Sequence, residues 1–392
     1  MDFQMNNRFI PYGRQNITEE DVAAVVEVLQ SDFLTQGPQV PKFENSVASR
    51  TGAAHAVAVN SATSALHIAC MALNLGPGDW LWTVPITFVA SSNCALYCGA
   101  RVDFVDIDPL TYTMSVPALA EKLSHAKSNG CLPKIIVPVH LCGQSADMEA
   151  IYGLAQEYGI KVIEDASHSI GADHQGKPVG DCRYSDITVF SFHPVKIITT
   201  CEGGLATTQD ADLPRKMQLS RSHGITREPA EMTHTSEGPW YYQQISLGYN
   251  YRMTEIQAAL GLSQMNQLNS FVKRRRILAA QYDKLLTNLP VQRPLQHPDS
   301  VSSWHLYVVR VAAQHRAAVF SALREAGIGV NLHYIPVHTQ PYYRAMGFEV
   351  GQFPNAEAYY SEAISIPLYA GLTDADQLQV MNALKSALEE NV

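Results

Sequence analysis

The stretch Ser191-Phe192-His193-Pro194-Val195-Lys196 ends a run of strand-forming residues and is followed by Glu202-Gly203-Gly204. A lysine in such a polar, glycine-flanked turn can hold an aldehyde cofactor as a Schiff base. The acidic pair Glu164-Asp165 ends another strand-like run upstream, so Asp165 is free to hold the ring nitrogen of that cofactor. The alternative is an ordinary surface lysine in a loop, which these surroundings disfavour.

The length of 392 residues predicts about two domains, or one large domain with a smaller companion. With 46% hydrophobic and 17% charged residues, the chain has the composition of a soluble globular protein. The net charge of -9 argues against nucleic acid or an anionic membrane as the main partner. An anionic ligand must therefore be held locally, by helix ends and a few well-placed donors.

The first thirteen residues are polar and lack the basic region and apolar run of a signal peptide. No stretch approaches the roughly 18 consecutive apolar residues of a membrane span. Seven cysteines without Cys-x-x-Cys pairs fit a reducing cytoplasm, and we expect no metal site. Cys94 and Cys98, on one predicted helix, are interpreted as packing residues and not as ligands.

Short apolar strands alternate with longer helical stretches, which predicts an α/β domain with a mainly parallel central sheet. The predicted strands are 56–60, 81–85, 101–106, 134–139, 161–164 and 187–192. Helices are predicted from Ser61 to Leu75 and from about Asp147 to Tyr158.

A long helical stretch begins at about Thr254, a plausible N-cap, and is expected to run with interruption to Leu286. Such a stretch commonly joins two domains, so we divide the chain into a large α/β domain, 10–262, and a small C-terminal α+β domain, 263–392. The small domain contains a predicted strand at 307–311 and predicted helices at 317–326 and from about 374. The four cations 273–276 favour a solvated helix face over a nucleic-acid patch.

Two turns carry the remaining chemistry. Small residues in Asn60-Ser61-Ala62-Thr63-Ser64 let backbone amides approach a phosphate at a helix N-terminus, although Ser and Thr also cap helices for structural reasons. In Glu164-Asp165-Ala166-Ser167-His168, the carboxylate of Asp165 can keep a pyridine nitrogen protonated. His168 could hydrogen-bond the ring hydroxyl, although a lone histidine is more often structural.

These motifs resemble the DegT/DnrJ/EryC1/StrS family of sugar-nucleotide aminotransferases, which are pyridoxal-phosphate enzymes of fold type I. The resemblance covers nearly the whole chain. Besides the motifs above, its marks are Tyr12-Gly13, Leu34-Thr35-Gln36-Gly37-Pro38, Ala65-Leu66, Pro138-Val139-His140 and Gly248-Tyr249-Asn250-Tyr251-Arg252. Where members often have glycine before the glutamate, this chain has Cys201, so a backbone angle there could differ.

The resemblance implies pyridoxal 5'-phosphate as cofactor and assigns roles to single residues. Lys196 would bind the cofactor and move the catalytic proton, for which its amine must be neutral. The residues implied for the cofactor are Lys196, Asp165, His168, Ser191, Ala62, Thr63 and Phe88, with Asn250 reaching the neighbouring subunit's cofactor phosphate. Those implied for the sugar nucleotide are Tyr12, Leu34, Thr35, Gln36, Gly37, Ser61, His333 and Tyr334. Phe88 and Tyr334 could instead be core aromatics, and Asn250 could merely cap the helix near Thr254.

Within the family, the opening stretch 10–18, the turn 199–202 and His333-Tyr334-Ile335-Pro336-Val337-His338 resemble the pseudaminic-acid subgroup. That implies amino transfer, with glutamate as the donor, to C4 of a UDP-linked 4-keto-6-deoxy-N-acetylhexosamine, giving UDP-4-amino-4,6-dideoxy-N-acetyl-β-L-altrosamine. It also implies a cytoplasmic homodimer with shared active sites. The alternatives are another nucleotide 4-keto-6-deoxy sugar as substrate, or a regulatory protein that binds the cofactor without turnover. A sugar dehydratase is disfavoured, because those members carry histidine at the position of Lys196.

Overall fold

The computed structural model describes residues 9–391. The prediction that the N-terminus is no signal peptide falls mostly on residues 1–8, outside the described residues. No helix of residues 9–391 is long and apolar enough to cross a membrane.

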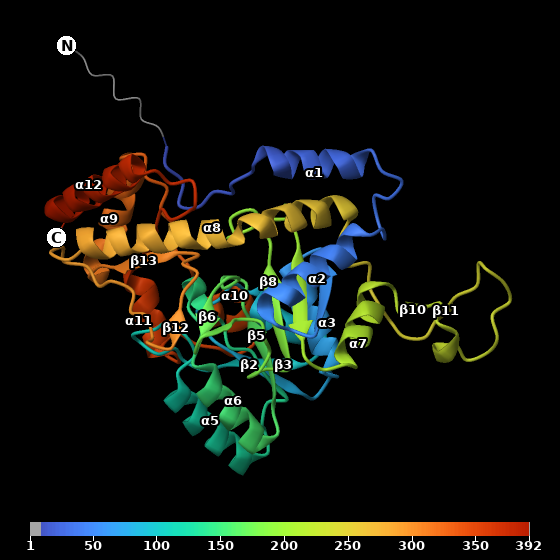
Figure 1. The fold of residues 1–392 in the computed structure, drawn as a ribbon. Coiled ribbons are helices and arrows are strands. Elements are labelled where there is room, and N and C mark those ends of the chain that lie inside the picture. The colour runs from blue at the N-terminus through green and yellow to red at the C-terminus, as the bar shows by residue number, and fades with distance from the viewer. Residues whose placement is uncertain (1–8, 392) are drawn as a thin grey trace.

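A seven-stranded sheet forms the centre of the protein, in the order β1-β9-β8-β5-β4-β2-β3 (Figure 1). Its strands are β1 (His55–Val59), β2 (Trp80–Thr83), β3 (Arg101–Phe104), β4 (Ile135–Ile136), β5 (Lys161–Asp165), β8 (Ile187–Ser191) and β9 (Gly204–Thr208). β9 runs antiparallel to both of its neighbours, whereas the other pairs of the sheet are parallel. The predicted mainly parallel α/β sheet is therefore confirmed, although β9 was not predicted.

Helices cover both faces of this sheet, because successive side chains of a strand point to opposite faces. Val57 and Val59 of β1 pack in the core that contains α3 (Ala62–Ala72) and α4 (Ala90–Tyr97). Ala58, between them, packs in a second core with α2 (Gln39–Thr51) and the long helix α8 (Glu255–Leu285). The remaining helices are α1 (Glu19–Leu29), α5 (Val116–Asn129), α6 (Met148–Tyr158), α7 (Leu213–Arg221), α9 (Ala313–Glu325), α10 (Pro341–Arg344), α11 (Pro354–Glu362) and α12 (Asp374–Asn391).

The helix α8 begins as predicted but is not interrupted. Thr254 is its N-cap: the hydroxyl of Thr254 accepts from the Gln257 amide, and the Gln257 side chain accepts from the Thr254 amide. The 31-residue helix then crosses the whole molecule (Figure 1). The proposed domain boundary at 262/263 therefore falls inside one continuous helix, and the division itself stays a prediction.

A third core lies at the C-terminal end of the molecule. It joins the last turns of α8 to α9, α12 and the two-stranded sheet of β13 (Tyr307–Arg310) and β14 (Ala363–Ile366). Ile10 also belongs to this core and pairs with Ile328, so the start of the chain packs with its C-terminal part.

The interpretation of residues 273–276 as a solvated face is wrong for Arg275. This side chain is 1% exposed, and its guanidinium donates to the carbonyl oxygens of Trp304, His305 and Leu368 at 2.9–3.2 Å. Burial lowers the pKa of Arg275 to about 10. The arginine therefore ties α8 to two segments of the C-terminal part.

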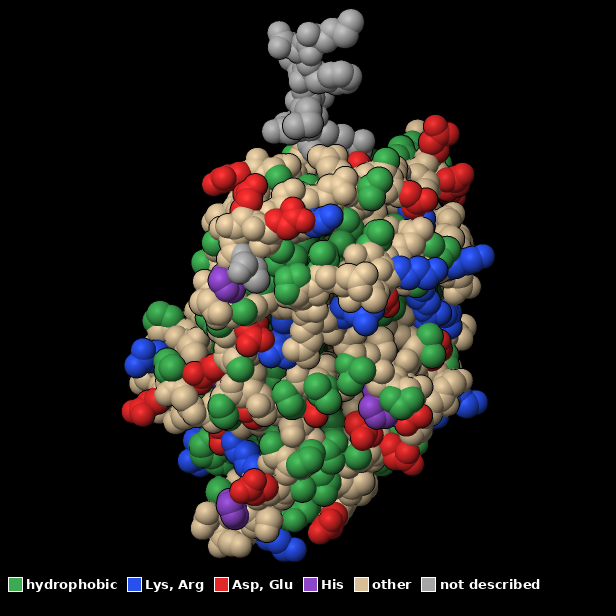
Figure 2. Space-filling model, turned by 90° about the vertical axis from the view of Figure 1, so that its left-hand side faces the viewer, with side chains coloured by type: hydrophobic (Ala, Val, Ile, Leu, Met, Phe, Trp, Pro, Cys, Tyr) green, Lys and Arg blue, Asp and Glu red, His purple; other side chains and the backbone are tan. Residues whose placement is uncertain are grey.

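The other strands are short and lie outside the central sheet. They are β6 (Asp173–His174), β7 (Lys177–Pro178), β10 (Ile225–Thr226), β11 (Gln243–Gln244) and β12 (Ser300–Val301). The segment that contains β10 and β11 projects from the body as an arm (Figure 1). Figure 2 shows acidic and basic side chains interspersed with hydrophobic ones on the face that lies at the left of Figure 1.

Candidate active site

Parallel strands end at one edge of a sheet, and this edge gathers the predicted site. Asp165 is the last residue of β5 and is 5% exposed. Its Oδ2 accepts a hydrogen bond from the Ser91 hydroxyl at 2.5 Å, and its Oδ1 accepts from the Ser167 amide at 3.1 Å. Ser91 lies in α4 and is fully buried, so two elements fix this carboxylate. Sequence reasoning missed Ser91, which no motif marks.

Lys196 lies in the turn between β8 and β9, close enough to Asp165 for their charges to interact. Burial lowers the pKa of the Lys196 amine to about 8, although Asp165 and Cys142 oppose this shift. With a pKa of about 8, about a tenth of the amine is neutral at pH 7, far more than for an ordinary lysine, and a nucleophile or general base requires this neutral form. Cys201, in the same turn, has φ 66°, so it keeps the left-handed conformation that glycine favours.

His168 is held on both sides by the protein. Its Nδ1 accepts from the Cys142 amide at 3.2 Å, which leaves the proton on Nε2, 3.1 Å from the hydroxyl of Tyr334. Burial, aided by the charges of Lys196 and His333, holds the pKa of His168 well below its usual range. The histidine is therefore neutral, and its Nε2 partner is Tyr334.

Aromatic side chains lie beside His168. Phe88 is 59% exposed, and its ring centre lies 6.2 Å from that of Tyr334. The reading of Phe88 as a core residue is therefore wrong. His333 is buried, and its ring centre lies 5.3 Å from that of Tyr12. The Nδ1 atom of His333 lies 2.8 Å from the Ser365 hydroxyl, and burial lowers the pKa of His333 to about 3.

The predicted phosphate turn lies at the start of α3. Ser61 is the N-cap, and its hydroxyl accepts from the Ser64 amide at 3.1 Å. The amides of Ala62 and Thr63 have no hydrogen-bond partner among residues 9–391, as expected for a first helical turn. They remain available to an anion at the positive end of the helix.

Gly204 brings this turn close to β8. A Cβ added at Gly204 would lie 2.4 Å from the Ala62 nitrogen and from the Ser61 carbonyl group. Ser191 pairs with Gly204 in the β8–β9 ladder, so its hydroxyl and the α3 amides flank the same glycine. The structure thus brings Ser191 and the phosphate turn together, as the cofactor assignment needs.

The segment Leu34 to Gly37 is exposed or half-buried and is fixed to the start of α8. The Leu34 carbonyl accepts from the Glu255 amide at 3.1 Å. Glu255 is fully buried, and its carboxylate accepts from the Gln39 and Val40 amides at 2.6 and 3.3 Å, which caps α2. Thr35 and Gln36 are exposed. Among residues 9–391, no hydrogen bond or ion pair joins this segment to Lys196.

Asn250 is exposed and lies in the loop before α8. The alternative that Asn250 caps this helix is wrong, because Thr254 is the N-cap. The neighbouring Tyr251 carbonyl accepts from the Asn60 amide at 2.8 Å, which places the loop beside the phosphate turn of the same chain.

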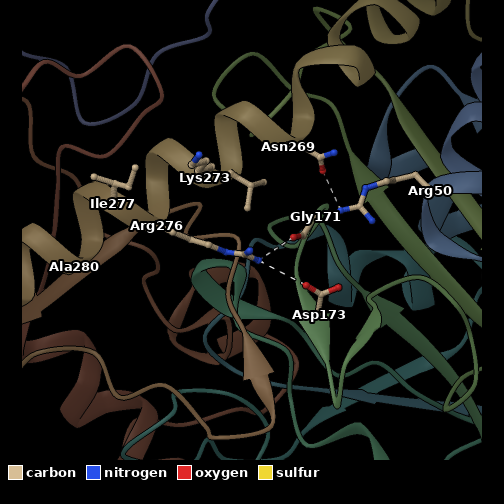
Figure 3. A pocket seen from close by; sticks show the side chains of 9 residues that line it. Arg50, Gly171, Asp173, Asn269, Lys273, Arg276, Ile277 and Ala280 are labelled. Atoms are coloured by element: carbon tan, nitrogen blue, oxygen red, sulfur yellow. Dashed lines mark hydrogen bonds and ion pairs between the residues drawn. The ribbon is translucent and has the colours of Figure 1, made fainter.

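Two surface hollows lie away from this cluster. The larger, about 530 Å³, runs along α8, where Arg276 points toward the Gly171 carbonyl and Asp173 while Arg50 donates to Asn269 (Figure 3). The smaller, about 350 Å³, is lined by residues 14–17, Tyr369 and Gly371. Among residues 9–391, no group of three or more His, Cys, Asp or Glu side chains is arranged to hold a metal ion.

The cluster fits a phosphorylated pyridine aldehyde. Lys196 supplies an amine with a lowered pKa, and Asp165 supplies a fixed carboxylate. The first turn of α3 supplies free amides, and it can approach β9 this closely only because Gly204 has no side chain. On this α/β sheet, such an arrangement defines a pyridoxal-phosphate-dependent transferase.

Comparison with known proteins identifies the family. The model of the DegT/DnrJ/EryC1/StrS aminotransferase family matches residues 15–385. The chain is 38% identical over 393 residues to the Bacillus subtilis spore coat polysaccharide biosynthesis protein SpsC, covering 98% of this chain and 99% of SpsC. The chain therefore belongs to the DegT/DnrJ/EryC1/StrS aminotransferase family.

Solved structures agree in fold and cofactor. The chain is similar to Helicobacter pylori PseC, an aminotransferase involved in the biosynthesis of pseudoaminic acid, with a TM-score of 0.89, 31% identity, and coverage of 98% of this chain and 100% of PseC. It is also similar to the Streptococcus pneumoniae putative sugar aminotransferase Spr1654 in its PMP form, with a TM-score of 0.91, 28% identity, and coverage of 98% and 100%. The protein is a pyridoxal-phosphate-dependent sugar aminotransferase of fold type I.

The chain's own residues divide the work of amino transfer. When bound, pyridoxal phosphate supplies an electron sink that stabilises negative charge on a reacting carbon. Asp165 would keep the proton on the ring nitrogen, and the Ser91 hydroxyl holds that carboxylate in position. The amine of Lys196, partly neutral because of its lowered pKa, can accept a proton and return it. Ser191 and the α3 amides would hold the phosphate.

Proposed function

We propose that the enzyme transfers an amino group to C4 of a UDP-linked 4-keto-6-deoxy-N-acetylhexosamine. The product would be UDP-4-amino-4,6-dideoxy-N-acetyl-β-L-altrosamine, an intermediate of pseudaminic acid biosynthesis in the cytoplasm. The observation that carries this proposal is the likeness to Helicobacter pylori PseC over 98% of the chain, in an enzyme with an intact Lys196 cluster.

The sugar nucleotide would lie against the aromatic side of the site. Tyr12, His333 and Tyr334 form a continuous row beside His168, with ring centres 5.3 Å apart for Tyr12 and His333 and 5.0 Å apart for His333 and Tyr334. The segment Leu34 to Gly37 and the hydroxyl of Ser61 are the further proposed contacts. Such rings can stack on a sugar or base, and their polar atoms can bind its hydroxyl groups.

A second candidate is another nucleotide 4-keto-6-deoxy sugar. The identity with the spore coat polysaccharide protein SpsC, 38%, exceeds the 31% identity with PseC. The chemistry at Lys196 would be the same in both cases, and only the recognition of the sugar would differ.

The mass of the product tests the proposal. Purified enzyme loaded with pyridoxal phosphate is incubated with ¹⁵N-glutamate and with UDP-4-keto-6-deoxy sugars of defined stereochemistry. We expect ¹⁵N in the sugar nucleotide, with highest turnover for the precursor of the altrosamine product, and none with Lys196→Ala. Faster labelling of a sugar of different stereochemistry would favour the second candidate, and labelling of no nucleotide sugar would refute the proposal.

We further propose that the enzyme works as a homodimer with shared active sites. The projecting arm carries large exposed hydrophobic side chains: Trp240 and Leu247 are 71% and 72% exposed, and Tyr242 is 52% exposed. Surfaces of this kind mark contacts with another protein chain. Asn250 follows this arm directly and is itself exposed, which leaves its side chain accessible to a second copy, where it would bind the cofactor phosphate.

A mixing experiment tests the sharing. Inactive Lys196→Ala chains mixed with inactive Asn250→Asp chains should regain part of the activity, because one site of each heterodimer would hold both native residues. The control mixes Lys196→Ala with Asp165→Asn, whose native residues lie in one chain's site, and should regain none. Proven subunit exchange without recovery in the first mixture would place Asn250 in its own chain's site or outside it.

A further inference from the structure

A second buried carboxylate, that of Glu164, stands next to Asp165 on β5. Successive side chains of a strand point to opposite faces, so Glu164 is turned away from the face that Asp165 occupies. Glu164 is 5% exposed, and its Oε1 accepts from the hydroxyls of Ser185 and Thr188 at 2.5 and 2.9 Å. Its Oε2 lies 2.7 Å from Nε2 of His140. This contact with His140 leads from Glu164 back to the active site.

His140 is fully buried, and both of its ring nitrogens have partners. The Nδ1 atom accepts from the Ala146 amide at 3.2 Å, so the proton of the neutral ring lies on Nε2 and is donated to Glu164. Burial acts to raise the pKa of Glu164, but the hydrogen bonds from His140 and from the two hydroxyls hold this pKa below its ordinary value. The charged carboxylate therefore fixes the orientation of the His140 ring.

The His140 ring closes a turn at the edge of the active site. This turn runs from His140 to Ala146, so the hydrogen bond between the ring and the Ala146 amide joins its two ends. Inside the turn, Cys142 has φ 61°, a left-handed conformation that a side chain disfavours and that the surrounding contacts must hold. The Cys142 amide donates to Nδ1 of His168 at 3.2 Å. The direction of this amide depends on the shape of the turn, and thus on the ring that Glu164 fixes.

We propose that His140 and Glu164 are positioning residues that hold the Cys142 amide on Nδ1 of His168. This hydrogen bond keeps the proton of His168 on Nε2, where it can be donated to the ring hydroxyl of pyridoxal phosphate. Without it, the neutral imidazole can carry its proton on either nitrogen, and only one of the two forms donates from Nε2. This role rests on the assignment of His168 to the cofactor and does not depend on which sugar the enzyme uses.

The first test locates the proton of His168 by ¹⁵N NMR of cofactor-free protein with labelled histidine rings. The signals of His168 are assigned by their loss in His168→Gln. In the wild type, we expect a bare Nδ1 and a protonated Nε2. His140→Phe keeps a ring but loses both hydrogen bonds, so its His168 signals should average two tautomers. If His140→Phe does not fold, His140→Asn replaces it and should shift the same signals in the same direction, because its shorter side chain does not reach Glu164.

Ser185→Ala is the matched control. It removes a different hydrogen bond to the buried Glu164 carboxylate and leaves the contact between Oε2 and His140. This variant should lower the Tm, as His140→Phe does, but should leave the His168 signals unchanged. A proton on Nδ1 of His168 in the wild type would overturn the proposal, and so would unchanged His168 signals in a folded His140 variant.

The second test measures the Kd for pyridoxal phosphate by absorbance titration. The apparent Kd rises by the inverse of the fraction of protein in the binding-competent form, so a fraction of one half to one tenth with the proton on Nε2 raises it about twofold to tenfold. We expect this rise in His140→Phe and none in Ser185→Ala. Glu164→Gln keeps an oxygen that accepts from His140 and should bind like the wild type. A changed tautomer with an unchanged Kd would overturn the role of His140 and Glu164 toward the cofactor.

Discussion

Replacement of Gly204 by alanine should damage the phosphate site without touching Lys196. The new Cβ would lie 2.4 Å from the Ala62 nitrogen and from the Ser61 carbonyl carbon and oxygen, all backbone atoms that cannot turn away. Either the start of β9 or the first turn of α3 must move. Overpacking of this kind costs about 1–3 kcal/mol.

This displacement should weaken cofactor binding, because the amides of Ala62 and Thr63 are the proposed phosphate donors. If most of the cost falls on the bound state, the Kd for pyridoxal phosphate should rise roughly tenfold to hundredfold, since 1.4 kcal/mol is a factor of ten. The assay is an absorbance titration of cofactor-free protein with pyridoxal phosphate, together with the Tm of the same samples.

Gly153→Ala is the matched control. Gly153 lies in α6, is exposed, and an added Cβ there would meet no atom within 4 Å. This substitution should stabilise the fold by up to about 1 kcal/mol, because alanine is the better helix former, and should leave the Kd unchanged. If Gly204→Ala binds pyridoxal phosphate as tightly as the wild type and has the same Tm, the close approach between Gly204 and the first turn of α3 does not determine the shape of the phosphate site.

Three further predictions concern the catalytic groups. Asp165→Asn should lower the rate by several orders of magnitude while the protein still folds, because the charge that holds the ring proton is lost; near-normal kinetics would assign that role to another group. Ser91→Ala removes a hydrogen bond to this carboxylate worth about 1.5–3 kcal/mol and should lower the rate about tenfold to hundredfold. The control Ser92→Ala removes a buried hydroxyl next to Tyr343 and should retain most of the wild-type rate. Cofactor-free protein should bind pyridoxal phosphate covalently faster as the pH rises through about 8 and then level off, because the amine of Lys196 is protonated below this pKa and neutral above it; a rate independent of pH would contradict the lowered pKa.

The sequence predicted those parts of the site that follow directly on a predicted strand. Lys196, Asp165 and the phosphate turn each stand at the end of a predicted strand, and parallel strands bring such ends to one edge. Their mutual approach in the structure follows from that rule. Ser91 was missed because it contacts Asp165 only after α4 packs against the sheet.

Features set by packing between distant segments could not be predicted. β9 follows a glycine motif that was interpreted only as a family mark, yet it inserts between β1 and β8. Arg275 stands in a run of four cations, and nothing local distinguishes it from its neighbours. Carbonyl groups about 30 and 93 residues away bury and bind it. Charge patterning describes the surface of a helix but does not show which turn faces a neighbouring segment.

The most direct test of the account is to locate the cofactor on the chain. Protein loaded with pyridoxal phosphate is reduced with borohydride, which makes the link between cofactor and lysine permanent, and is then digested for peptide mass spectrometry. We predict that the added mass lies on Lys196, and that Lys196→Ala carries none after the same treatment. Stable labelling of a different lysine in the wild-type protein, with Lys196 unmodified, would contradict the assignment of the site.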